Sequence, residues 1–143
     1  MKRIISLVSL LVIVVLALAG CKAVKNLEGQ EFEDAKVNLV PIAENLLTGF
    51  TQKDFAIASR DFGANMVKAM TEDKFISMAE QFEEKLGAFQ SSQLDSIAQT
   101  GEYLSVNFTL VYEKAPKVTM RVVCSAAEPY QVTGLWFDAP ELR

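Results

Sequence analysis

The chain of 143 residues contains no histidine. Histidine is the most frequent general base in enzymes and a common zinc ligand, so its absence excludes Ser–His and Cys–His nucleophilic pairs and most zinc sites. We therefore expect no metal site and no cofactor, and no residue is assigned as catalytic.

Cysteine and basic residues are also scarce. The chain has only two cysteines, Cys21 and Cys124, and its 14 lysines and arginines face 18 aspartates and glutamates. The basic residues are scattered singly among acidic ones, whereas binding to a nucleic-acid backbone requires clustered lysine and arginine. Nucleic acid is therefore excluded as an expected partner.

The first 21 residues have the layout of an export signal. Lys2 and Arg3 precede a mostly apolar segment at residues 4–18, and Ala19, Gly20 and Cys21 follow. Residues 4–20 span 17 positions, which is the short limit for crossing a bilayer, although an uncleaved membrane anchor remains the alternative. Residues 18–21 (LAGC) resemble the lipobox of bacterial lipoprotein signals. The resemblance implies cleavage between Gly20 and Cys21 and attachment of lipid to the Cys21 thiol.

This interpretation divides the chain into a signal peptide at residues 1–20, a lipidated cysteine with a polar tether at 21–32, and one domain at 33–143. We expect the protein to be exported and anchored to a bacterial membrane through its lipid. In a Gram-negative organism Lys22 resembles the residue found in outer-membrane lipoproteins, so the domain would face the periplasm. Removal of Lys2 and Arg3 with the signal leaves 12 basic and 18 acidic residues, a formal charge of −6.

The first half of the domain has helical periodicity. Apolar residues from Leu39 to Phe50 recur at the spacing of one buried helix face, with Pro41 at its start or at a kink and Gly49 at its exit. Residues 51–54 (TQKD) predict the start of a short second helix, and residues 63–70 are ambiguous between helix and strand. Thr71 predicts the N-cap of a third helix that ends at Gly87.

From residue 89 the period changes to two, which is typical of strands. In residues 104–112 and 118–126, apolar side chains expected to point inward alternate with side chains expected to point outward. A loop at 113–117 separates the two segments. Residues 93–99 and 130–137 predict two further strands. The expected inward side chains on the two central strands are apolar apart from Tyr112: Leu104, Val106, Phe108, Leu110, Tyr112, Val118, Met120, Val122 and Cys124. The fold class is thus α+β, with three N-terminal helices packed on a curved four-stranded antiparallel meander.

This order of elements, with residues 43–47 (AENLL), 71–75 (TEDKF) and 132–137 (VTGLWF), resembles the nuclear-transport-factor-2-like superfamily. The closest match is to exported bacterial domains of unknown function in that superfamily. The resemblance implies a cystatin-like cone over nearly all of residues 33–138. Members include enzymes, ligand-binding modules and assembly modules, so the fold alone does not assign a function.

Two classes of function remain open. The first is a non-catalytic module for a small apolar ligand or an envelope protein, with Phe50, Tyr112, Met120 and Trp136 around the mouth of the cone as the candidate pocket. The second is an isomerase-like or dehydratase-like enzyme with an acidic base inside the cone, for which Asp61 and Asp95 lie nearest the expected core. Outward-facing Val111 and Val123 also suggest a homodimer formed through the sheet.

Overall fold

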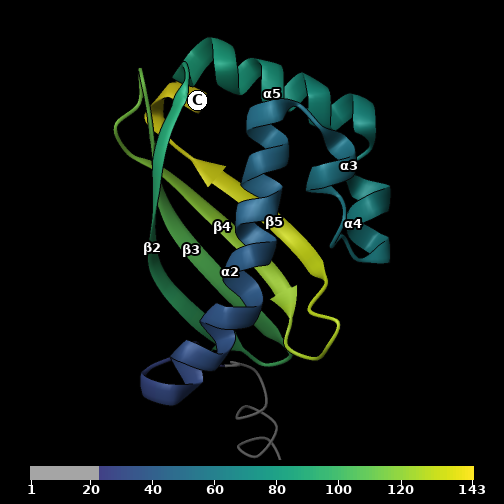
Figure 1. Cartoon of the computed structure of the whole chain (residues 1–143), viewed down its shortest axis with the longest axis vertical. Helices are drawn as coiled ribbons and strands as arrows, with labels where there is room; N and C mark the ends of the chain where they lie inside the picture. Colours follow the sequence, from purple (N-terminus) through teal and green to yellow (C-terminus); the bar gives the residue numbers. More distant parts are fainter. Residues whose placement is uncertain (1–22) are drawn as a thin grey trace, which may run out of the picture.

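The computed structural model describes residues 23–143, so Gly20, Cys21 and the export signal lie outside the described residues. Four helices are followed by the four long strands of an antiparallel sheet (Figure 1). The helices are α2 (Gly29–Gln52), α3 (Phe55–Ala58), α4 (Ala64–Ala69) and α5 (Glu72–Leu86). The strands are β1 (Lys25–Asn26), β2 (Phe89–Thr100), β3 (Tyr103–Tyr112), β4 (Val118–Ser125) and β5 (Val132–Asp138), and a 3-10 turn, η1 (Pro140–Leu142), ends the chain.

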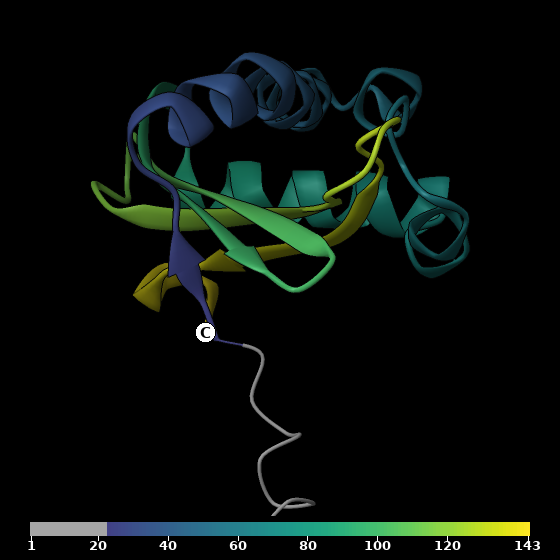
Figure 2. The same ribbon diagram turned by 90° about the horizontal axis from the view of Figure 1, so that it is seen from below.

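The strands lie in the order β1-β2-β3-β4-β5, and each is antiparallel to its neighbours. α2 crosses one face of this curved sheet, and no α-helix of residues 23–143 covers the opposite face (Figure 2). We call the face turned away from α2 the open face. The expected α+β class and the antiparallel meander are confirmed, with five strands in place of four and four helices in place of three.

The inner face of the sheet and the helices enclose one filled core. Burial alternates strictly along β3 and β4, and all nine side chains expected to point inward are buried. Phe50 of α2 packs against Phe75 and Phe82 of α5 and against Phe137 of β5, with ring centroids 4.6 to 5.6 Å apart. The core therefore joins the central helix, the last helix and the edge strand through aromatic contacts.

α2 differs from the sequence prediction in where it begins and in the role of Gly49. It begins at Gly29 and continues through Pro41 to Gln52. Pro41 is exposed, so the Val37 carbonyl that loses its helical partner is on the solvent side, where water can satisfy it. Gly49 lies inside the helix instead of ending it, because α3 approaches there: a β-carbon on Gly49 would be 2.5 Å from the Ala58 β-carbon.

The two short helices also differ from the sequence prediction. Asp54, and not Thr51, caps α3, since its carboxylate accepts a hydrogen bond from the Ile57 backbone N–H at 3.0 Å. The ambiguous segment at 63–70 contains the helix α4. Thr71 occupies the N-cap position of α5 as expected, although its side chain makes no capping hydrogen bond.

The predicted tether at residues 21–32 is partly folded. Lys25 and Asn26 pair with Gln99 and Ala98 of β2, and α2 begins only three residues after Asn26. The domain therefore includes residues that the sequence assigned to a linker. Among the described residues, no helix is both long and apolar enough to cross a membrane.

Candidate functional site

The four residues of the predicted pocket do not come together. Met120 is fully buried in the core, whereas the Trp136 side chain is 58% exposed on the open face. Phe137 is the inward-facing neighbour, because it pairs with Met120 while Trp136 pairs with Arg121. Side chains alternate along a strand, so Trp136 must point away from the core.

Phe50 and Tyr112 do share a cavity. It lies between the end of α2, α5 and the start of β2, and its volume is about 190 Å³. Burial raises the pKa of the Tyr112 hydroxyl to about 12, which keeps it protonated at ordinary pH. Small-molecule sites commonly occupy about 300 to 1,000 Å³, so this cavity is smaller than the usual range.

The acidic residues nearest the core lie at its outside. Asp61 forms an ion pair with Arg60, 3.0 Å away, and Asp95 accepts a hydrogen bond from the Thr109 hydroxyl at 2.7 Å. Within residues 23–143 no polar or charged side chain is buried, and no group of three acidic or cysteine side chains could hold a metal ion. An acidic base of the kind the enzyme alternative requires would have to act from the surface.

Cys124 occupies the inward position that its strand alternation predicts. Its side chain is fully buried, and burial, with a smaller contribution from the charge of Asp61, raises the pKa of the thiol to about 12. The thiol is thus held in its neutral, unreactive form.

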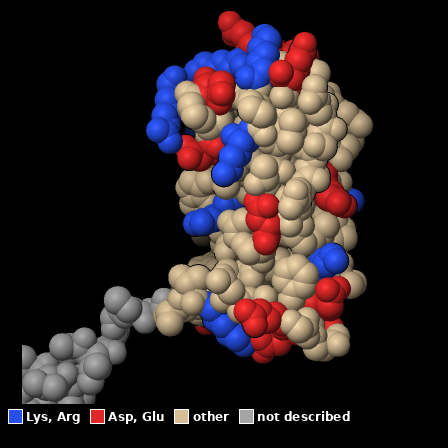
Figure 3. Space-filling model, turned by 90° about the vertical axis from the view of Figure 1, so that its left-hand side faces the viewer, with Lys and Arg blue, Asp and Glu red and all other residues tan. Residues whose placement is uncertain are grey.

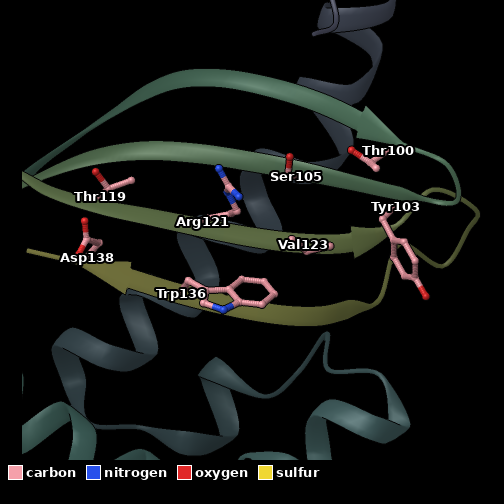
Figure 4. Close-up of a pocket in the computed structure, with 8 residues that line it drawn as sticks. All are labelled: Thr100, Tyr103, Ser105, Thr119, Arg121, Val123, Trp136 and Asp138. Carbon is pink, nitrogen blue, oxygen red and sulfur yellow. The ribbon is translucent and has the colours of Figure 1, made fainter. Parts of the chain in front are cut away.

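The open face carries a row of side chains that crosses four strands. Ser96, Asn107, Arg121 and Trp136 are successive pairing partners on β2, β3, β4 and β5. The Asn107 amide donates to the Ser96 hydroxyl at 3.1 Å, and Arg121 Nε donates to Asn107 Oδ1 at 2.9 Å. These two hydrogen bonds direct the Arg121 side chain toward β3, and both Arg121 and Trp136 line the same hollow (Figure 4).

The neighbouring row carries shorter side chains, and two of its residues, Ser105 and Val123, line a hollow. Ala98, Ser105, Val123 and Gly134 are successive partners there. The resulting hollow has a volume of about 470 Å³, and Arg121, Thr119, Trp136 and Tyr103 are among the side chains that surround it (Figure 4). A second hollow of about 560 Å³ adjoins it toward α4 and shares Tyr103, Val123 and Trp136.

The indole ring of Trp136 can lie over residue 134 because that residue is glycine and has no β-carbon. A β-carbon at this residue would be 2.4 Å from Cη2 of Trp136 and 2.5 Å from its Cζ3. The ring therefore lies back over the backbone of its own strand, at the edge of the hollow. A larger residue at position 134 would push the ring away.

The charges of the domain are distributed unevenly between its layers. Twelve of the 18 acidic residues lie in residues 28–84, which form the helical layer and its connections. The charged residues of the four long strands are Asp95, Arg121 and Asp138, and all three lie on the open face. Along the β2 side of the molecule, charges of both signs are interspersed with uncharged residues (Figure 3).

Sequence reasoning missed Arg121, Asn107 and Ser96 as site residues. Each stands at an outward position of an alternating strand, where a polar side chain is ordinary. Their common row depends on the strand register, including an irregularity in β2 between Leu94 and Ser96. A local pattern does not contain that information.

Residues 43–132, which are more than half of the chain, match the model of a family described as "Protein of unknown function (DUF3887)". No curated protein matches the sequence.

Proposed function

We propose that this chain, which belongs to the DUF3887 family of proteins of unknown function, is an exported, lipid-anchored binding protein of the bacterial envelope. It acts without catalysis, and its ligand binds to the open face of the sheet. The observation that carries this proposal is the contrast between the two faces: the interior is filled by apolar side chains, whereas the open face has a hollow of about 470 Å³ beside an exposed tryptophan.

The anchor is supported by the lipobox-like residues 18–21 and by the position of β1. Only residues 22–24 separate Cys21 from Lys25, which is already paired with β2. Four residue steps span at most about 14 Å, so lipid on Cys21 would hold the domain directly at the membrane surface. In a Gram-negative organism this membrane would be the outer membrane, with the domain in the periplasm. The arrangement of helices on a curved antiparallel sheet also fits a nuclear-transport-factor-2-like cone, and we include that assignment in the proposal.

The binding surface can be tested with protein from the natural host. We would purify the lipid-anchored mature protein and measure retained molecules by native mass spectrometry. The expected result is a bound small molecule that is lost from Trp136→Ala but retained by Val37→Ala, which removes another exposed apolar side chain from α2. Retention of the same molecule by Trp136→Ala would contradict a site on the open face.

The anchor requires a separate experiment. Cys21→Ser removes the thiol that receives lipid, so we expect the protein to lose the lipid mass and its mature N-terminus, as measured by intact-mass analysis of the membrane fraction. A Cys21→Ser protein with the same mature mass and the same membrane attachment would refute lipidation.

A second copy of the chain is the alternative partner for the open face. The exposed Trp136 and Tyr103, 58% and 48% accessible, together with Val123 favour this alternative because a sheet-to-sheet dimer would cover them. Sedimentation of the mature protein in detergent distinguishes the two: a dimer that becomes monomeric in Trp136→Ala supports self-association, and a monomer at all concentrations rules it out.

A further inference from the structure

The chemistry of the hollow indicates what kind of ligand it takes, provided that the open face is the binding surface proposed above. We propose that it binds a small molecule in which a carboxylate or phosphate group lies next to a flat apolar group. The guanidinium group of Arg121 binds the oxyanion, and the indole ring of Trp136 contacts the flat group.

The Arg121 guanidinium is held in place through one nitrogen, which leaves its other N–H donors available. Its Nε donates to Asn107, whose amide in turn donates to Ser96, so the side chain is fixed by hydrogen bonds that span three strands. Within residues 23–143, its two terminal nitrogens have no hydrogen-bond or ion-pair partner. Two parallel N–H donors at the end of a guanidinium match the two oxygens of a carboxylate or phosphate.

The acidic residues near this group are already engaged. Asp138 borders the hollow, but Arg143 forms an ion pair with it at 3.0 Å, and Asp95 accepts a hydrogen bond from Thr109. Arg121 is thus the one basic residue of the four long strands, and the described residues give it no counter-ion. Although the chain has a net charge of −4, the Arg121 guanidinium gives the open face a local positive charge that attracts an anion.

The shape of the hollow favours a small molecule over a membrane. Ser105 and Val123 line the depression between the larger side chains of Arg121, Tyr103 and Trp136, and its volume of about 470 Å³ falls within the range of small-molecule sites. A flat lipid surface would leave this depression unfilled. The side chains of Thr119 and Ser105 line it and supply hydroxyl groups close to the oxyanion.

The single tryptophan of the chain makes the site directly observable, because all tryptophan fluorescence comes from Trp136. We would place the mature protein in nanodiscs of phosphatidylcholine and titrate it with phenyl phosphate, benzoate and the uncharged benzyl alcohol. We expect both anions to bind at least about fivefold more tightly than benzyl alcohol, which is a modest value for a charge-assisted hydrogen bond at an exposed site.

Variants separate charge from geometry. Arg121→Gln should abolish the preference for anions, and Arg121→Lys should retain part of it, since lysine keeps the charge without the fork. Asn107→Ala should weaken anion binding although the charge remains, because the guanidinium is no longer oriented. Arg60→Gln is the control: it removes an exposed arginine whose partner is Asp61 and which does not line the hollow, so it should leave the anion preference unchanged.

Four results would overturn the inference: equal binding of the three probes, no binding of any probe, an unchanged anion preference in Arg121→Gln, or a response only to nanodiscs that contain phosphatidylglycerol. The last result would identify a lipid headgroup as the ligand. An uncharged ligand retained from the host and lost in Trp136→Ala would refute the anion and leave the proposed binding function intact.

Discussion

Gly49→Ala tests how closely α3 approaches α2. Intrinsic helix propensity alone predicts that the change stabilises the protein by about 1 kcal/mol, since glycine is unfavourable inside a helix. The structure predicts the opposite. The new β-carbon would lie 2.5 Å from the Ala58 β-carbon and 2.6 and 2.7 Å from the Ala58 backbone nitrogen and α-carbon.

The clash cannot be relieved by a side-chain rotation, because two of these three atoms belong to the α3 backbone. Ordinary carbon–carbon contacts are about 3.5 to 4.0 Å, so α3 would have to move by about 1 Å. The Asn45 amide, which donates to the Ile57 carbonyl at 2.6 Å, ties α3 to α2 and opposes that movement. Overpacking costs about 1 to 3 kcal/mol, so after the propensity gain we expect a net loss of up to about 2 kcal/mol in place of the gain.

Urea unfolding followed by circular dichroism measures this difference. Thr48→Ala is the matched control, because Thr48 is the preceding residue of α2 and is exposed. It should stabilise the protein by roughly 0.5 kcal/mol through propensity alone. If Gly49→Ala raised the urea midpoint as Thr48→Ala does, with an unchanged m-value, the close approach of α3 to α2 would be refuted.

Three further predictions concern the two faces of the sheet. Gly134→Ala should shift the fluorescence emission of Trp136, since its β-carbon would lie 2.4 Å from the indole ring, while changing stability by less than about 1 kcal/mol; an unchanged spectrum would contradict the observed ring position. Met120→Ala should lower the free energy of unfolding by about 2 to 5 kcal/mol and Trp136→Ala by less than about 1 kcal/mol in urea titrations, and similar losses would argue against the assignment of the faces. Burial raises the pKa of Cys124 from 9.0 and that of Tyr112 from 10.0 to about 12, so well below pH 9 both groups are neutral in the folded and the unfolded chain. Stability is lost as the pH rises through 9.0 toward about 12, because the unfolded chain ionises first. Cys124→Val should reduce the loss that begins near the ordinary thiol pKa of 9.0, as measured by urea midpoints across this range, and an identical pH profile would show that the thiol does not contribute.

The amino-acid sequence by itself determined the four long strands of the sheet and which side chains of the two central strands fill the core. The alternation along β3 and β4 predicted all nine inward residues, because side-chain direction in a strand depends only on local position. The buried face of α5 and its end at Gly87 were also predicted, because helical spacing and a terminating glycine are local sequence signals. The interpretation of residues 18–21 as a lipobox is likewise local, and it remains a prediction because these residues lie outside the described part of the chain.

Tertiary structure alone decided where a ligand could bind. Trp136 was assigned to the cone mouth although it faces away from the core, since only its pairing with Arg121 shows which face it occupies. Gly49 reads as a helix end in the sequence, and its actual role depends on Ala58 of another helix. The row of Ser96, Asn107, Arg121 and Trp136 joins residues up to 40 positions apart, and its alignment follows from strand register and a local irregularity in β2. Such pairing is set by contacts between distant segments, which a local sequence pattern does not specify.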